Sequence, residues 1–192
     1  PPQLPDPSMH QTFIVDPHDI FTRYQALYAP TSRLREAARV GFLVPARVSY
    51  LLFVAVPGFF VFRYVLALIA IVPVYLLLKR MYGRWAGFVG IAVVMSSPVL
   101  VTAWGTDYPD SAAVSYLTGG LAALAMSWEV QRWRLGWLGV AAVLLTLTVW
   151  THGVSVPLAV VMVAVYLALR VARKREHLAW DLALLAAIGV AV

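Results

Sequence analysis

The chain is dominated by apolar blocks close to the length that an α-helix needs to cross a lipid bilayer, roughly 20 residues. Four or five blocks qualify, and an apolar run from Leu182 begins another; the blocks cover about Phe59 to Leu78, Trp85 to Trp104, Ala112 to Val130, Leu135 to Trp150 and Val154 to Leu169. Charged residues make up only 12% of the chain, whereas a soluble domain carries about a quarter. We therefore predict an all-α fold, a polytopic transmembrane bundle with about five to six spans.

Basic residues alternate between the connections of these blocks. Three connections are basic and contain Lys79, Arg80 and Arg84, then Arg132 and Arg134, then Arg170, Arg173, Lys174 and Arg175. The connections between them, residues 106–110 and 151–153, contain no Lys or Arg. Because basic loops stay in the cytoplasm, we expect 106–110, 151–153 and the segment before the first span to lie outside. The net charge of +6 is then a topology signal, which predicts membrane lipids rather than nucleic acid as partners.

This layout divides the chain into two regions. Residues 1–58 are predicted to form an extracytoplasmic loop with juxtamembrane helices, and residues 59–192 the transmembrane helices. The chain opens on Pro1 without an initiator Met and stops at Val192 inside an apolar run. We expect it to be an internal segment of a longer integral protein of a bacterial plasma membrane.

The outer loop is predicted to be helical. Asp16 suits the N-cap of a first helix, Pro17 its first position and Asp19 its third. A second helix is predicted after Thr31-Ser32, and it bears Arg33, Arg35 and Arg39. Residues 42–56 are apolar but are interrupted by Pro45 and Arg47 and closed by Pro57-Gly58. We expect an interfacial or re-entrant helix there.

Ionisable residues gather on the predicted outer face. They are Asp16, Asp19, Asp107, Asp110 and His152, with Arg33, Arg35, Arg39, Arg47 and Arg63 nearby. A carboxylate can act as general base towards an acceptor hydroxyl. Arginine side chains can bind and neutralise a phosphate leaving group. The combination predicts a phosphate-releasing transfer from a lipid-borne donor at the membrane surface.

Structural roles explain the same residues equally well. Helix capping accounts for Asp16 and Asp19, and a polar turn with Asp110 as the next N-cap accounts for the second outer loop. His152 fits a turn beside a glycine, and Arg63 can extend towards lipid headgroups. Both readings stay open at the level of sequence.

Cofactor motifs are absent from the sequence. The chain has no cysteine, no Gly-rich phosphate loop and no HExxH motif. We predict no cofactor and no dedicated metal site, although two or three Asp side chains can bind a divalent cation.

Several short motifs follow one another in a characteristic order. They are Asp16-Pro-His-Asp19-Ile-Phe-Thr-Arg-Tyr24-Gln-Ala26, Arg63-Tyr64, Tyr75-Leu-Leu-Leu-Lys79-Arg80-Met-Tyr82-Gly83-Arg84, Ser97-Pro98 and Thr106-Asp107-Tyr108-Pro109-Asp110. In this order the chain resembles the GT-C superfamily of integral-membrane glycosyltransferases, most closely family 39 and the ArnT/PMT-like group. Members of that group use polyprenyl-phosphate sugars, and the likeness covers nearly the whole segment.

The resemblance implies an inverting sugar transfer at the outer face, from a lipid-linked donor to an unknown acceptor. In such families an Asp of the first outer loop is the base, which falls on Asp16, with Asp19 as the competing choice. The acidic residue of the second loop falls on Asp107 or Asp110. The family's basic residue between the fourth and fifth spans is replaced by His152, and its first-loop Asp-Glu pair by Asp-Pro-His-Asp.

The resemblance also suggests how the donor is held. Arg63, with Arg33 or Arg39, would bind the donor phosphate, and Tyr24 belongs to the same first-loop motif. Two other classes stay open: a secondary transporter or flippase-like carrier, and a catalytically silent GT-C-like subunit. The middles of the predicted spans are almost free of charged residues, which favours chemistry at the membrane surface over a translocation path.

Overall fold

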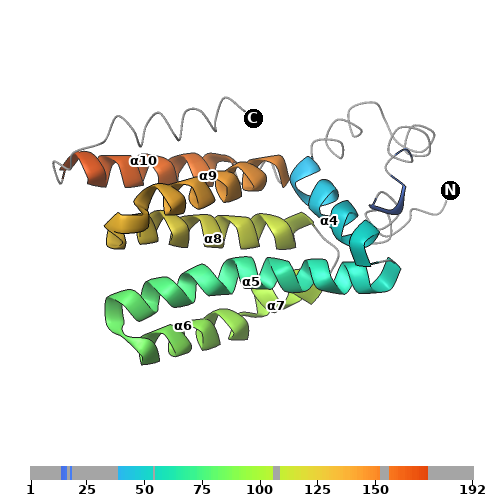
Figure 1. Cartoon of the computed structure of the whole chain (residues 1–192), viewed down its shortest axis with the longest axis horizontal. Helices are drawn as coiled ribbons and strands as arrows, with labels where there is room; N and C mark the ends of the chain where they lie inside the picture. Colours follow the sequence, from blue (N-terminus) through green and yellow to red (C-terminus); the bar gives the residue numbers. More distant parts are fainter. Residues whose placement is uncertain are drawn as a thin grey trace.

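The computed structural model describes residues 14–16, 18, 39–53, 55–105, 109–151 and 156–172. Within these ranges the regular structure is helical and no strand occurs, which confirms the all-α prediction. The elements, labelled in Figure 1, are α4 (Val40–Phe53), α5 (Ala55–Tyr82), α6 (Arg84–Ser96), α7 (Pro98–Gly105), α8 (Pro109–Glu129), the 3₁₀ helix η1 (Gln131–Trp133), α9 (Arg134–Thr151) and α10 (Val156–Ala172).

Helices occupy all five predicted blocks, but the second block is broken. α5, α8, α9 and α10 each cover one block. The block from Trp85 to Trp104 is divided into α6 and α7 at Ser97, whose backbone is extended at φ −67° and ψ 116°. The next residue is Pro98, and a proline disfavours the helical conformation for the residue before it. α6 therefore ends one residue before Ser97.

The first predicted span begins earlier than its apolar core suggested. α5 starts at Ala55 and includes Pro57 and Gly58, which the sequence placed at the end of the preceding helix. A proline is tolerated in the first helical turn, because the N–H groups there have no acceptor within the helix. α5 then continues through Pro73 to Tyr82.

α8 is the central helix of the bundle. It packs against α5 on one side and α9 on the other, and Figure 1 shows the three side by side. Most of its buried residues are small; they include Ser111, Ala112, Ala113, Ser115, Gly119, Gly120, Ala122, Ala123 and Ser127. Small residues let helix backbones approach closely. A Cβ atom at Gly119 would collide with the carbonyl oxygen of Ile69 on α5.

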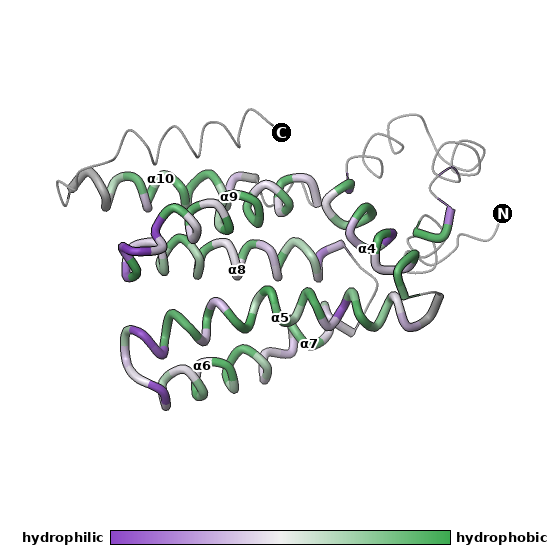
Figure 2. The backbone as a smooth tube through the Cα atoms, in the orientation of Figure 1, coloured by the Kyte–Doolittle hydropathy of each residue, from purple (hydrophilic) through white to green (hydrophobic). Residues whose placement is uncertain are grey.

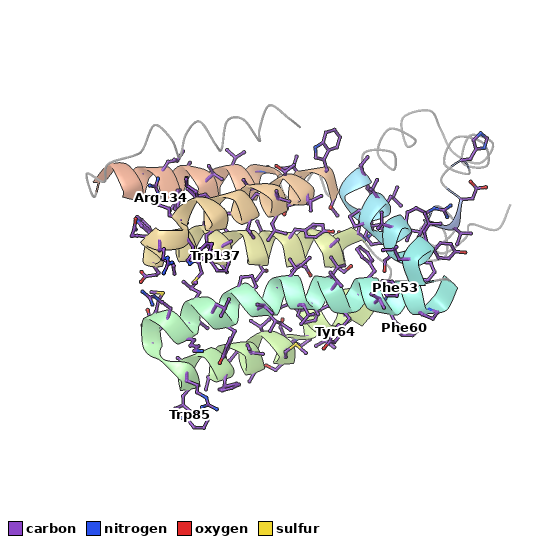
Figure 3. The ribbon with its side chains drawn as sticks, viewed as in Figure 1. Phe53, Phe60, Tyr64, Trp85, Arg134 and Trp137 are labelled. Carbon is purple, nitrogen blue, oxygen red and sulfur yellow. The ribbon has the colours of Figure 1, made fainter. Side chains whose placement is uncertain are left out.

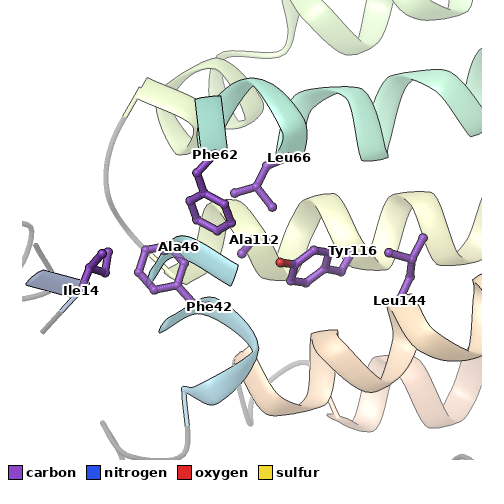
Figure 4. Close-up of a cluster of buried hydrophobic side chains, with 8 residues drawn as sticks. All are labelled: Ile14, Phe42, Ala46, Phe62, Leu66, Ala112, Tyr116 and Leu144. Atoms are coloured by element: carbon purple, nitrogen blue, oxygen red, sulfur yellow. The ribbon is translucent and has the colours of Figure 1, made fainter. Parts of the chain in front are cut away.

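α4 crosses one end of the bundle and packs on α5, α9 and α8 (Figure 1). Its close approach to α9 requires a glycine, since a Cβ atom at Gly41 would lie 2.5 Å from the Leu147 carbonyl oxygen. The Tyr116 hydroxyl of α8 donates to the Gly41 carbonyl oxygen at 3.2 Å. A buried apolar cluster joins these elements, and Figure 4 shows it: Ile14, Phe42, Ala46, Phe62, Leu66, Ala112, Tyr116 and Leu144. A helix thus lies where the sequence predicted one for residues 42–56, with the bounds Val40–Phe53.

Hydrophilic residues concentrate at the opposite end of the bundle. The α5–α6 turn carries the exposed residues Lys79, Arg80 and Arg84, and the α8–α9 connection carries the exposed Gln131 and Arg132. Figure 2 shows both connections at the end remote from α4. The sequence predicted these two basic connections on the same side of the membrane. In the structure both lie at the same end of the bundle (Figure 2).

Two helical segments in the described ranges, Pro57–Tyr82 and Gln131–Thr151, are long and apolar enough to cross a membrane. Val40–Phe53, Arg84–Ser96 and Ala159–Ala168 are apolar but shorter. Large apolar side chains are exposed around the helices, among them Leu51, Leu52, Phe53, Phe60, Tyr64, Trp85, Val93, Leu135 and Val160; Figure 3 labels several of these. Length and apolarity thus identify two candidate spans among the five helical blocks.

Candidate functional site

The structure describes four of the nine residues that the sequence assigned to the site, namely Asp16, Arg39, Arg63 and Asp110. The other five lie outside the described residues: Asp19, Tyr24, Arg33, Asp107 and His152. Residue 39 directly precedes α4, and Asp110 lies at the start of α8. Both helix starts lie at the α4 end of the bundle, away from the basic turns (Figure 1).

Asp16 accepts a local hydrogen bond of the capping type. Its Oδ1 atom accepts the backbone N–H of His18 at 3.0 Å. Asn and Asp side chains commonly accept a backbone N–H two residues on. This local bond gives Asp16 a structural role, and because the residue is exposed, its carboxylate is also accessible to a ligand.

Arg47 attaches the segment that carries Asp16 to α4. Its Nη1 atom donates to the Ile14 carbonyl oxygen at 2.8 Å and also to that of Val15. The Ile14 side chain, 1% exposed, packs in the cluster of Figure 4. A charge-assisted hydrogen bond and an apolar contact thus hold residues 14–16 against α4. Their combination positions Asp16 at the end of the bundle.

The sequence did not assign Arg47 to the site. It named this arginine only as a neighbour, although Arg47 is the single charged residue in the apolar stretch of α4. An isolated charge inside an apolar helix is a usable signal, since such a group needs a polar partner. Here the partners are main-chain carbonyl oxygens far away in the sequence.

Asp110 is not the N-cap that the sequence predicted. α8 begins at Pro109, so Asp110 lies within its first turn. Proline is favoured at the first helical position because its φ angle already suits the helix and no N–H is needed there. A carboxylate in the first turn interacts favourably with the helix dipole, which gives Asp110 a structural role as well.

The two described arginines of the site come from different elements. Arg63 of α5 is half-buried, and its guanidinium carbon lies 5.9 Å from the ring centroid of Phe60. The carbonyl oxygen of Arg39 accepts the N–H groups of Phe42 and Leu43, both at 3.0 Å, at the start of α4. Arg63 thus belongs to α5, and Arg39 directly precedes α4.

The described part of the site offers carboxylates and guanidinium groups, and no group of metal ligands. Three or more His, Cys, Asp or Glu side chains do not gather anywhere in the described ranges. Carboxylates can accept a hydrogen bond from a hydroxyl, and guanidinium groups can bind an anion. Comparisons with protein-family models, with curated proteins and with solved structures find no match to this chain.

Proposed function

We propose that the chain belongs to a membrane glycosyltransferase that moves a sugar from a polyprenyl-phosphate donor to an acceptor on the extracytoplasmic side. One observation carries the proposal: the two ends of the bundle differ in their ionisable residues. Asp16 and Asp110 lie at the α4 end, together with Arg39, Arg47 and Arg63 (Figure 1). The opposite end carries the basic turns, which by the positive-inside rule would face the cytoplasm.

In the proposed reaction Asp16 takes the proton of the acceptor hydroxyl. The hydroxyl oxygen forms a bond to the anomeric carbon with inversion, and the bond from that carbon to the donor phosphate oxygen breaks. Polyprenyl phosphate leaves, and Arg63 with Arg33 or Arg39 stabilises its growing negative charge. Asp107 or Asp110 orients the acceptor or the sugar, and Asp19 is the alternative base.

The proposal includes a membrane position for the whole bundle. α5 and α9 would each cross the bilayer, as would α8, α10 and the broken pair α6–α7. α4 would lie in the outer interface, because it runs across the bundle and is exposed at Leu51, Leu52 and Phe53. A catalytic site at that end would meet the headgroup of a lipid-borne donor.

Two substitutions of Asp16 separate catalysis from capping. Asn keeps a side-chain oxygen for the His18 N–H and is as good a cap as Asp, but it cannot act as a base. We therefore expect D16N to fold like the wild type and to lose transfer by about 100-fold or more, the usual contribution of general-base catalysis. The assay uses membranes with the full-length protein and radiolabelled polyprenyl-phosphate sugars.

The matched control is E129Q, which neutralises an exposed carboxylate at the other end of α8 and should transfer at the wild-type rate. If D16N keeps full activity while D16A loses protein stability, Asp16 is a cap only, and Asp19 becomes the candidate base. Absence of transfer by a folded wild-type protein from every donor would instead favour a carrier or a silent subunit.

A further inference from the structure

The turn between α5 and α6 carries three basic residues and no acidic one. Lys79 and Arg80 lie in the last turn of α5, Arg84 is the first residue of α6, and all three are exposed. Residues 55–105, which include both helices, contain no Asp or Glu. Neither α5 nor α6 can therefore supply a carboxylate that would neutralise these charges.

Two of the three cations are held in place by aromatic rings. The Nζ atom of Lys79 lies 5.7 Å from the ring centroid of Tyr75, and the Cζ atom of Arg84 lies 5.7 Å from that of Phe88. The two rings are in contact with each other, with their centroids 5.4 Å apart. Tyr75 belongs to α5 and Phe88 to α6, so this ring pair holds the cations of both helices together. An aromatic ring attracts a cation but has no net charge, so these contacts order the positive charge without neutralising it.

The other basic connection at this end of the bundle has a different arrangement. In the connection between α8 and α9, the exposed Arg132 follows the exposed carboxylate of Glu129 by three residues. The positive-inside rule requires basic residues in such connections but no particular arrangement of them. The rule therefore accounts for Arg132, but it does not explain why Lys79 and Arg84 are ordered against one ring pair.

The surroundings of the α5–α6 turn indicate that the anion belongs to a lipid. The apolar segment Pro57–Tyr82, which is long enough to cross a membrane, ends at this turn. Tyr82 and Trp85 are exposed beside the cations, and Figure 3 shows Trp85 pointing away from the bundle. Exposed Trp and Tyr at the end of a span are typical of the headgroup level of a bilayer. Basic residues at that level are attracted to the anionic lipids of the cytoplasmic leaflet.

We propose that Lys79, Arg80 and Arg84 bind the headgroup of an anionic phospholipid in the cytoplasmic leaflet. Lys79 and Arg84 contact the lipid phosphate, which a guanidinium group can bind through two oxygens, and Arg80 adds to the attraction. The inference rests on the membrane position included in the proposed function, and not on glycosyl transfer. A carrier or a silent subunit with the same orientation would bind the lipid equally well.

Native mass spectrometry tests this site on the full-length protein. The protein is placed in nanodiscs with equal amounts of phosphatidylglycerol and phosphatidylcholine of the same chains, and is then released into mild detergent. We expect the wild type to retain phosphatidylglycerol in preference to phosphatidylcholine. R84Q should lower the retention of phosphatidylglycerol by about fivefold. This loss corresponds to about 1 kcal/mol, the contribution of one basic residue near an anionic membrane surface.

R132Q is the matched control, because it removes one exposed cation from the same end of the bundle but outside the α5–α6 turn. It should retain phosphatidylglycerol like the wild type. F88L keeps all three charges of the turn and removes the ring that orders Arg84. We expect F88L to lower retention by about twofold, since an exposed cation–π contact is weak.

Equal retention by R84Q and the wild type would overturn the proposal. Equal losses in R84Q and R132Q would do the same, because they would show an effect of net charge alone, and so would a wild type with no preference for phosphatidylglycerol. Displacement of the lipid by excess inorganic phosphate or by an acidic peptide would identify a soluble anion or a protein segment as the occupant instead. Sugar transfer is measured on the same preparations, so a failure of the proposed function is seen separately from a failure of the lipid site.

Discussion

Single polar contacts determine how the α4 end is assembled. Arg47 holds the carbonyl oxygens of residues 14 and 15, Tyr116 holds that of Gly41, and Ser49 holds that of Gly58. Each contact joins segments that the apolar cluster alone would leave free to slide, because hydrogen bonds are directional and apolar contacts are not. The position of Asp16 depends on the first of these contacts.

R47M removes the guanidinium and keeps much of the aliphatic side chain. A hydrogen bond to a charged group stabilises by about 1.5–3 kcal/mol, and a loss at the lower limit corresponds to about tenfold. We therefore expect amide hydrogen exchange in residues 14–18 to become about tenfold faster, while exchange in α8 and α9 stays unchanged. Mass spectrometry of peptic peptides measures both.

R80M serves as the control, since Arg80 is exposed at the opposite end. It should leave exchange in residues 14–18 as in the wild type. If R47M leaves that exchange unchanged, Arg47 does not hold the segment.

At the scale of elements, the contact between α5 and α8 depends on an unusual pairing of residues. Pro73 has no N–H, so the carbonyl oxygen of Ile69, four residues earlier, has no helical donor. Gly119 of α8 lies at this carbonyl, where a Cβ atom would collide with it. The proline and the glycine together allow the two helices to pack at close range.

G119A should therefore destabilise the bundle. The added methyl group meets a backbone oxygen, which cannot move aside as a flexible side chain can, and overpacking of this kind costs about 1–3 kcal/mol. G139A is the matched control, because nothing lies within 4 Å of a Cβ atom at Gly139 on α9. It should be neutral or stabilise by up to about 1 kcal/mol through helix propensity.

Thermal unfolding in detergent, followed by circular dichroism, compares the two glycine variants. A G119A protein as stable as G139A would show that α5 and α8 are not in close contact at this point.

At the scale of the whole molecule, the bundle has two chemically different ends. One holds α4, Asp16 and Asp110, and the other holds the basic α5–α6 and α8–α9 connections. Trp85 is 79% exposed and Tyr82 70% exposed at the basic end, as aromatic residues at a membrane boundary would be. The proposed topology places these two ends on opposite sides of the membrane.

Cysteine labelling tests this topology, because the chain has no cysteine of its own. V15C and V40C report the α4 end, and Y82C and Q131C report the basic end; all four positions are exposed. We expect a membrane-impermeant maleimide added to spheroplasts to label V15C and V40C at once. Y82C and Q131C should react only after the membrane is lysed. Labelling of all four in intact spheroplasts, or of the basic pair alone, would contradict the proposed orientation.

Local patterns in the sequence determined the helices. The apolar blocks predicted α5, α8, α9 and α10, because the length and composition of a block are properties of neighbouring residues. Where a prediction missed, a proline was placed wrongly relative to the helix end: Pro98 divides a block, Pro57 lies in the first turn of α5, and Pro109 begins α8 so that Asp110 is inside the helix. The alternation of basic connections likewise predicted which turns share an end.

Only the tertiary structure decided which residues the ends bring together. The bond from Arg47 to residues 14 and 15 spans more than 30 positions of the chain, and no periodicity or motif specifies such a partner. The acceptor role of Asp16 could be predicted, since its donor, the His18 N–H, lies only two residues on. Its attachment to α4 and the contact of Gly119 with Ile69 depend on how whole helices cross. Crossing geometry follows from the fit of side chains on two surfaces, which a single sequence does not display.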